Sequence, residues 1–248
     1  CDCGCMSKRS TPICVLASGG IDSAALLTRS LTAGGRVVPL FLRCGLSWEA
    51  AELSWLRRFL RAVWSPRLLP LRVLDVPLRS TYGAPSTSLP GPPGATAGAG
   101  RGPSRAKSRD GAHWSLTGRR VPGAASADAA VYLPGRNVLL LTHAAILCAR
   151  EGMTTIALGT LKGNPFGDAT PRFFRDMAAC LSQALRRPIR VLAPLRRLTK
   201  PQLIRATPDV PWALTFSCLQ PRGRRHCGRC NKCAERRRAF RAAGVPDP

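Results

Sequence analysis

A run of small and polar residues near the start of the chain has the composition of a phosphate-binding loop. An apolar stretch of strand length, 13–17, leads into Ser-Gly-Gly-Ile-Asp-Ser at 18–23, where an apolar helical pattern begins. Two glycines allow a sharp turn and a close approach of the backbone to an oxyanion. The helix that follows directs unpaired N–H groups and the positive end of its dipole at the same point. The two serines add hydroxyl donors, and Asp22 could hold Mg²⁺ or cap the helix.

The spacing distinguishes this loop from other phosphate loops. No Gly-Lys-Ser/Thr follows the glycines, so the loop is not a Walker P-loop. The pattern resembles the PP-loop of enzymes that cleave ATP between the α- and β-phosphates. The alternative is an ordinary strand-to-helix turn punctuated by serine and glycine. The predicted nucleotide-binding residues are Ala17, Ser18, Gly19, Gly20, Ile21, Asp22 and Ser23.

A second cluster of reactive side chains lies between residues 218 and 233. It contains four thiols, Cys218, Cys227, Cys230 and Cys233, the last three spaced as Cys-x-x-Cys-x-x-Cys. Four thiolates at this spacing can close a tetrahedral zinc site, which leaves no position for water and is therefore structural. An iron–sulfur cluster or redox-active, unliganded thiols are the alternatives. His226 could replace one ligand, although its neighbour Cys227 makes simultaneous binding strained.

The elements that must position these residues follow from apolar periodicity. Strand-like runs at 37–42 and 69–76 alternate with helical patterns at 23–32 and 48–63. This βαβαβ order predicts a parallel sheet with right-handed crossovers. The ligand is then expected at the carboxyl edge of the first strand, where the loop lies.

The second half of the chain continues this alternation and adds polar candidates. Helices are predicted at 138–150 and 171–185, strands at 155–159 and 189–193, and a short helix opening at 198–201. Five side chains at the expected ligand edge are candidates for contacts with substrate or phosphate. For Asp168 the alternative role is structural, because Asp168 or Thr170 could instead cap the helix at 171–185. Lys200 at a helix start is unfavourable unless an anion is near, which makes it a phosphate candidate. These residues are Arg136, Asn137, Lys162, Asp168 and Lys200.

Composition bounds the class of protein and its partners. The chain has 248 residues, is 45% apolar and carries a formal net charge of +25. The charge favours an anionic partner such as nucleic acid. The competing interpretation is compositional drift towards Arg, Ala, Gly and Pro, because the arginines form no single block and few aromatics interleave with them. No secretory signal or membrane-spanning stretch is recognised, so a cytoplasmic protein is expected.

Three segments are expected from composition and motif placement. We expect a disordered tail at 1–12, with Met6 as the natural start, and a PP-loop α/β domain at 13–205. A four-Cys region with a helix follows at 206–248. Residues 83–110 are rich in Gly, Pro, Ser and Ala and are expected to form a disordered insertion.

Taken together, the motifs resemble the 7-cyano-7-deazaguanine (preQ0) synthases of queuosine biosynthesis, a family of PP-loop ATP pyrophosphatases. The resemblance rests on the PP-loop, Pro-Gly-Arg-Asn at 134–137, Asp168, Leu-Thr-Lys at 198–200, Phe-Ser-Cys at 216–218 and the cysteine knuckle at 227–233. It implies a Rossmann-like α/β fold of the adenine nucleotide alpha hydrolase (HUP) type with a small zinc knuckle. It also implies catalytic roles for Asp22, Lys162 and Lys200, substrate contacts by Arg136, Asn137 and Asp168, and the cofactors ATP, Mg²⁺ and structural Zn²⁺.

The implied reaction joins ammonia to 7-carboxy-7-deazaguanine through an adenylated carboxylate and ends in the nitrile. Two loops depart from the family pattern. Arg-Cys-Gly-Leu-Ser-Trp at 43–48 replaces a Tyr-Gly-Gln-type segment, and 164–170 replaces a Gly-Tyr-Pro-Asp-Cys-like loop. A paralogue acting on a related base or directly on tRNA or DNA is therefore the alternative, and a non-catalytic binding protein is a third. Whether the protein forms a homodimer stays an open question.

Overall fold

The computed structural model describes residues 11–83 and 113–248. The expected tail at 1–12 and insertion at 83–110 lie almost wholly outside these ranges, so both stay predictions. The chain runs in the order β1(Ile13–Leu16), α1(Ile21–Thr32), β2(Val37–Arg43), α2(Glu49–Ala62) and β3(Arg72–Asp75). The short helices α3(Arg79–Tyr82), α4(Trp114–Thr117) and η1(Asp128–Val131) follow.

The second half begins with the longest helix, α5(Arg136–Glu151), and β4(Thr155–Ala157). After η2(Gly167–Ala169) come α6(Pro171–Leu185), β5(Arg190–Leu192) and α7(Lys200–Ala206). The chain then passes through η3(Trp212–Leu214) into α8(Asn231–Ala243). The expected alternation of strands and helices is confirmed, with ends that differ from the predicted ones by a few residues.

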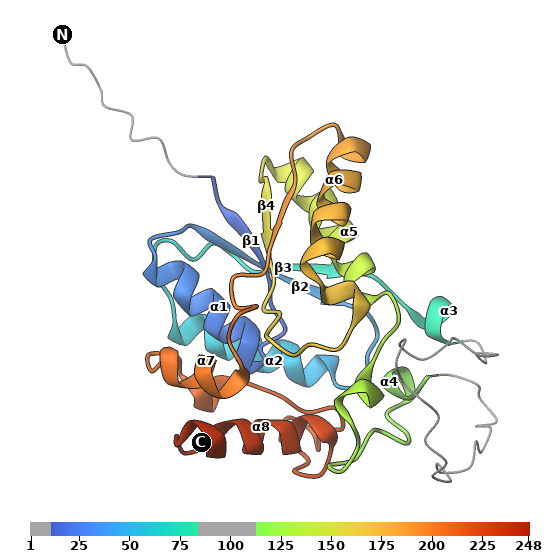
Figure 1. The fold of residues 1–248 in the computed structure, drawn as a ribbon, viewed down its shortest axis with the longest axis vertical. Helices are drawn as coiled ribbons and strands as arrows, with labels where there is room; N and C mark the ends of the chain where they lie inside the picture. Colours follow the sequence, from blue (N-terminus) through green and yellow to red (C-terminus); the bar gives the residue numbers. More distant parts are fainter. Residues whose placement is uncertain (1–10, 84–112) are drawn as a thin grey trace.

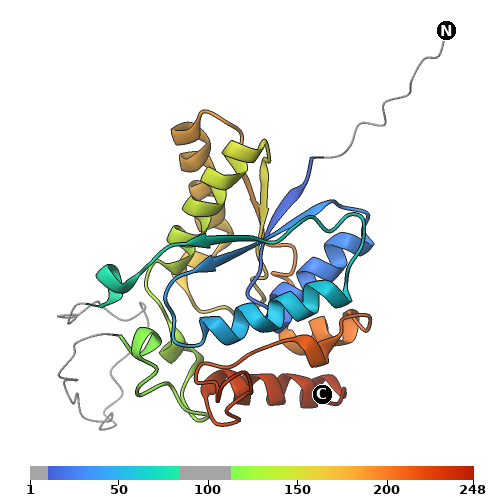
Figure 2. The same ribbon diagram turned by 180° about the vertical axis from the view of Figure 1, so that it is seen from behind.

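The five strands form one parallel sheet in the order β3-β2-β1-β4-β5. The strand order reverses at β1, so the crossovers from β1 run to both sides and open a crevice at the carboxyl ends of β1 and β4. In Figures 1 and 2, α5 and α6 cover one face of the sheet, whereas α1 and α2 cover the other, with α7 and α8 beyond them. The fold is therefore the predicted parallel α/β sheet, with helices on both faces.

Each face of the sheet has its own hydrophobic cluster. One cluster joins β1 to α1, α2 and α7 and includes Phe240 of α8, so the C-terminal helix shares the core of the sheet. The other joins β1, β2 and β4 to α5 and α6. A third cluster lies at the carboxyl edge and packs Trp48 and Phe216 against the cysteine knuckle. The knuckle is thereby held next to the crevice.

Candidate functional site

The PP-loop is held in shape by its own serines. The Ser18 N–H donates to Ser23 Oγ at 3.2 Å, the Gly20 N–H donates to Ser18 Oγ at 3.3 Å, and the Ser23 hydroxyl donates to the Gly20 carbonyl at 3.1 Å. Gly19 has φ +78°, and a Cβ on it would lie 3.3 Å from the Glu52 carbonyl oxygen. The glycine is therefore required both by its backbone angle and by the close passage of α2.

The start of α1 lies directly behind this loop, two residues earlier than predicted. Asp22 lies in its first turn, and its Oδ1 atom is buried without a hydrogen-bond partner among the described residues. Burial raises the pKa of the Asp22 carboxyl, while the Lys200 ammonium acts in the opposite direction. An unpartnered carboxylate oxygen at this point fits a hard cation such as Mg²⁺.

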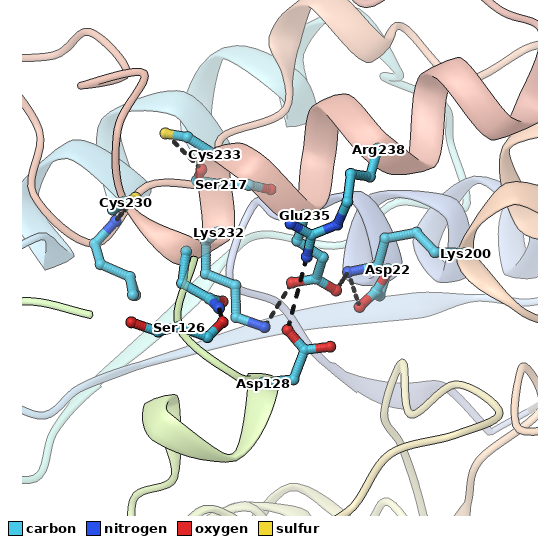
Figure 3. A network of polar contacts seen from close by, with 12 residues as sticks. Asp22, Ser126, Asp128, Lys200, Ser217, Cys230, Lys232, Cys233, Glu235 and Arg238 are labelled. Atoms are coloured by element: carbon cyan, nitrogen blue, oxygen red, sulfur yellow. Dashed lines mark hydrogen bonds and ion pairs between the residues drawn. The ribbon is translucent and has the colours of Figure 1, made fainter. Parts of the chain in front are cut away.

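A chain of ion pairs connects Asp22 to the cysteine knuckle (Figure 3). Lys200 Nζ lies 3.5 Å from Asp22 Oδ2 and 2.6 Å from Glu235 Oε1, and Lys232 Nζ lies 2.6 Å from Glu235 Oε2. Burial alone would lower the pKa of Lys200, but the two carboxylates outweigh it and raise that pKa. Burial would raise the pKa of Glu235, but the two lysines lower it to about 2. The anions that Lys200 faces here are thus carboxylates of the protein.

A cavity of about 280 Å³ opens at the carboxyl edge of the sheet beside the PP-loop. Ser18, Asp22 and Ser23 line one side of it. Both loops that depart from the family pattern reach it, through Leu46 and through 164–168. The two loops therefore lie at the same edge of the sheet as the PP-loop.

Three ionisable side chains that face this cavity come from α2 and α5. Glu49 and Glu52 extend from α2, and Arg136 extends from the first turn of α5. Burial raises the pKa of Glu52 to about 8, with Arg136 lowering it and Glu49 raising it further. The Arg136 Nε atom is buried and unpartnered among the described residues, so it can donate to an anion in the cavity.

Asp168 and Asn137 hold each other across the mouth of the cavity. The Asn137 backbone N–H donates to Asp168 Oδ2 at 2.9 Å, and its side-chain amide donates to the Asp168 carbonyl at 2.8 Å. Asp168 therefore satisfies an N–H in the first turn of α5, while Thr170 accepts from the Phe173 N–H and caps α6. Lys162 is exposed and does not line the cavity, although its backbone N–H donates to the Leu198 carbonyl at 2.9 Å.

The four predicted thiols converge on one point. Their Sγ atoms all lie within 4.8 Å of one another, and the Cys218–Cys230 and Cys227–Cys233 pairs are each 4.0 Å apart. A tetrahedral Zn²⁺ with Zn–S bonds of about 2.3 Å requires sulfur atoms about 3.8 Å apart, so the geometry fits zinc. The Cys227 N–H donates to Cys218 Sγ at 3.3 Å, as thiolate ligands commonly require. His226 accepts from the Ser217 N–H at 3.0 Å and is outside the cluster.

The segment before the knuckle is fastened to the PP-loop. The Phe216 N–H donates to the Gly19 carbonyl at 2.8 Å, and a Cβ on Gly20 would lie 3.9 Å from Ser217 Oγ. Arg236, only 5% exposed, bonds to Asp247 and to the backbone carbonyls of Thr215 and Trp212. The buried guanidinium therefore fixes the path of residues 212–217, the strap that connects the knuckle to the PP-loop.

Three acidic residues of the site were missed by the sequence analysis: Glu49, Glu52 and Glu235. The two in α2 carried a usable signal, because acidic residues at 49 and 52 adjoin the apolar stripe of that helix at 53, 56 and 59. Glu235 carried none, since its partner Lys200 lies 35 positions away. No helix within the described ranges is long and apolar enough to cross a membrane.

Comparison with known proteins gives a consistent assignment. The model of the family described as "Queuosine biosynthesis protein QueC" matches residues 115–244. A 7-cyano-7-deazaguanine synthase of Anaeromyxobacter sp. (strain Fw109-5) is 31% identical, with 98% of this chain and 97% of the relative aligned. One of Myxococcus xanthus (strain DK1622) is 30% identical, with 98% and 97% aligned. These alignments span almost the whole chain, whereas the family model begins after the PP-loop.

Among solved structures, a 4-thiouridine synthetase determined with RNA and bound ATP aligns with 94% of this chain and 50% of its own. The TM-score is 0.48 and the sequence identity is 14%.

Proposed function

Since the chain belongs to the QueC family of queuosine biosynthesis proteins, we propose that it is an ATP-dependent carbon–nitrogen ligase that makes a nitrile from a carboxylate. The proposed substrate is 7-carboxy-7-deazaguanine and the nitrogen donor is ammonia. The observation that carries the proposal is the joint placement of the PP-loop, the unpartnered Asp22 oxygen and the unpartnered Arg136 Nε around one cavity.

The chemistry requires activation of a poor electrophile. A carboxylate resists attack by ammonia, whereas its adenylate carries a good leaving group. Transfer of AMP to the carboxylate releases pyrophosphate, and ammonia then displaces AMP to give the amide. A second ATP-dependent step removes water from the amide and yields the nitrile.

The residues of the loop are suited to the charge that develops in the first step. The N–H groups at the start of α1 and the hydroxyls of Ser18 and Ser23 would stabilise the departing pyrophosphate. Asp22 would hold Mg²⁺, which neutralises phosphate charge when bound. Arg136 is placed to orient a carboxylate by donating from its free Nε atom.

The zinc knuckle has a structural role in this proposal. Four thiolates leave no open position for water or substrate. Zinc held there would fix the start of α8, which carries Glu235, and the strap that contacts the PP-loop. Elemental analysis of freshly purified protein should give about one zinc per chain. A value well below that would contradict the four-Cys site.

The decisive experiment is incubation with ATP, Mg²⁺, ammonium and 7-carboxy-7-deazaguanine, with AMP and the nitrile followed by mass spectrometry. We expect both products, and we expect Asp22→Asn to abolish them. Asp176→Asn, an exposed aspartate of α6, is the matched control and should leave both unchanged. AMP without nitrile would reject this carboxylate while keeping the loop assignment. ATP turnover only in the presence of tRNA would favour direct modification of nucleic acid.

A further inference from the structure

A second cavity, lined mainly by arginines, lies on the outer side of α2. Its volume is about 680 Å³, and Arg43, Arg57, Arg58, Arg61 and Arg224 line it. Three of these come from the last two turns of α2, Arg43 ends β2, and Arg224 comes from the knuckle loop on the opposite side. We call this cavity and its five arginines the arginine groove.

The groove carries an excess of positive charge that the described residues do not neutralise. Arg43 pairs with Asp75 at 2.7 Å, whereas Arg57, Arg61 and Arg224 have no acidic partner among the described residues. The ranges 1–10 and 84–112 contain only two acidic residues, Asp2 and Asp110. Glu49, the acidic side chain in the lining, already accepts from the backbone N–H groups of Gly45 and Leu46.

The opposite wall of the groove is fixed in place. The Trp55 indole N–H donates to the Arg224 carbonyl at 2.7 Å. Reciprocal backbone hydrogen bonds between Arg222 and Arg225 close a tight turn around Arg224, with Gly223 at φ +59°. Arg58 lies over the Trp55 ring, its guanidinium carbon 5.2 Å from the ring centroid. The two walls are therefore held together, and their charges cannot separate freely.

We propose that the arginine groove binds the phosphate backbone of a single-stranded nucleic acid. Guanidinium groups match phosphate oxygens in a planar, bidentate geometry. Arg57 and Arg61 are one turn apart on α2, so their charges are spaced about 6 Å along the helix. Successive cationic side chains along a groove are what a chain of phosphates requires.

An exposed aromatic ring favours nucleic acid over an acidic polypeptide. Trp64, two residues beyond the end of α2, is 73% exposed. Trp64 follows the groove residue Arg61 by three positions and lines a separate cavity with Thr28 and Asp209. Cationic side chains together with an exposed aromatic ring are the usual combination for binding single strands, because unpaired bases stack on the ring. This inference concerns binding only and does not depend on the proposed ligase reaction.

The test is binding of a labelled single-stranded RNA of roughly 20 nucleotides, and of DNA of the same sequence, to the full chain at several salt concentrations. The test variant carries Arg57→Gln, Arg61→Gln and Arg224→Gln. The control variant carries Arg175→Gln, Arg187→Gln and Arg197→Gln, which removes the same charge from exposed arginines that do not line the groove. Thermal unfolding checks that both variants fold.

We expect the groove variant to bind on the order of 100-fold more weakly at about 0.1 M salt, with the salt slope reduced by about 2, since each lost phosphate contact accounts for about 0.7. The control variant should bind within a few-fold of the unmodified chain. Trp64→Leu should weaken binding by roughly tenfold.

Several outcomes would overturn the proposal. Equal losses in the two triple variants would show a general charge effect without a groove. Unchanged binding by the groove variant, or no binding by the unmodified chain, would show that the arginine groove does not bind nucleic acid. Competition by polyglutamate as effective as RNA at equal charge would identify an acidic polypeptide instead. Binding of both RNA and DNA, weakened alike in the groove variant, would support the proposal and show that the ligand is single-stranded nucleic acid of either kind.

Discussion

Replacement of Glu52 by glutamine should stabilise the protein, and increasingly so as the pH rises. Glu52 faces the PP-loop cavity, and burial raises the pKa of its carboxyl from 4.5 to about 8. In the folded protein the carboxyl keeps its proton up to about pH 8, whereas in the unfolded chain it ionises above 4.5. The stability that the protonated carboxyl allows is therefore present below pH 4.5 and is lost as the pH rises towards 8.

The size of the effect follows from that displacement of the pKa. A shift from 4.5 to about 8 corresponds to an upper bound of roughly 5 kcal/mol above pH 8. The cavity opens to solvent, so we expect about 2–3 kcal/mol. Glutamine has nearly the shape of the protonated carboxyl and does not titrate. The two proteins should be almost equally stable near pH 4.5 and should diverge above it.

The assay is urea unfolding of both proteins at about pH 5 and about pH 8.5. A gap in the free energy of unfolding that does not widen between these pH values would refute the account of Glu52. Glu49→Gln is the matched control on the same helix. Glu49 accepts from the backbone N–H groups of Cys44, Gly45 and Leu46, so its replacement should destabilise by about 1–3 kcal/mol.

Three further substitutions probe the supports of the site. Arg236→Met should lower the free energy of unfolding by about 3–5 kcal/mol, because it leaves Asp247 and the carbonyls of the strap unpaired. Calorimetry should show a Tm lower by roughly 10 °C, and a shift below about 2 °C would contradict this. Glu235→Gln should lower the free energy of unfolding by about 1–3 kcal/mol. A double-mutant cycle with Lys232→Met should give a coupling energy above about 0.5 kcal/mol, and additive losses would show that the two side chains do not interact. Gly159→Ala places a Cβ 2.9 Å from the Asp22 carbonyl carbon and should cost about 1–3 kcal/mol and weaken ATP binding in calorimetric titration. Gly167→Ala meets nothing within 4 Å and should change neither quantity.

The sheet could be predicted because each strand is a short apolar run between helical patterns. The ends were less predictable. Helix α1 begins at Ile21 and α5 at Arg136, each two residues before the predicted start. Polar residues in a first turn do not interrupt a helix, since its first N–H groups need no intrahelical acceptor. The predicted strand at 69–76 is shortened to Arg72–Asp75, where it pairs with β2.

The candidate site was predictable where its residues are close in sequence and not where they meet across the fold. The four thiols and the PP-loop each occupy one short segment, and both assemble as the spacing indicates. Asp168 and Asn137 were recognised separately, but the two hydrogen bonds that Asn137 donates to Asp168 join α5 to η2 across 31 positions of the sequence. Lys162 was singled out by its loop, but its residue is exposed and does not line the cavity, so its catalytic role stays a prediction.

The hydrogen bond between Phe216 and Gly19 has a consequence for the order of events during synthesis. The PP-loop is translated early, but the strap that closes over it and the lysine beside Asp22 are translated much later. Domains generally fold as units, and the core around β1 and α1 includes Phe240 of α8, so a nascent chain lacks part of that core until α8 has emerged. It cannot complete the proposed nucleotide site until residues 200–235 have followed. We expect ribosome-bound chains truncated before this region to lack ATP affinity, which would keep incomplete chains from consuming nucleotide.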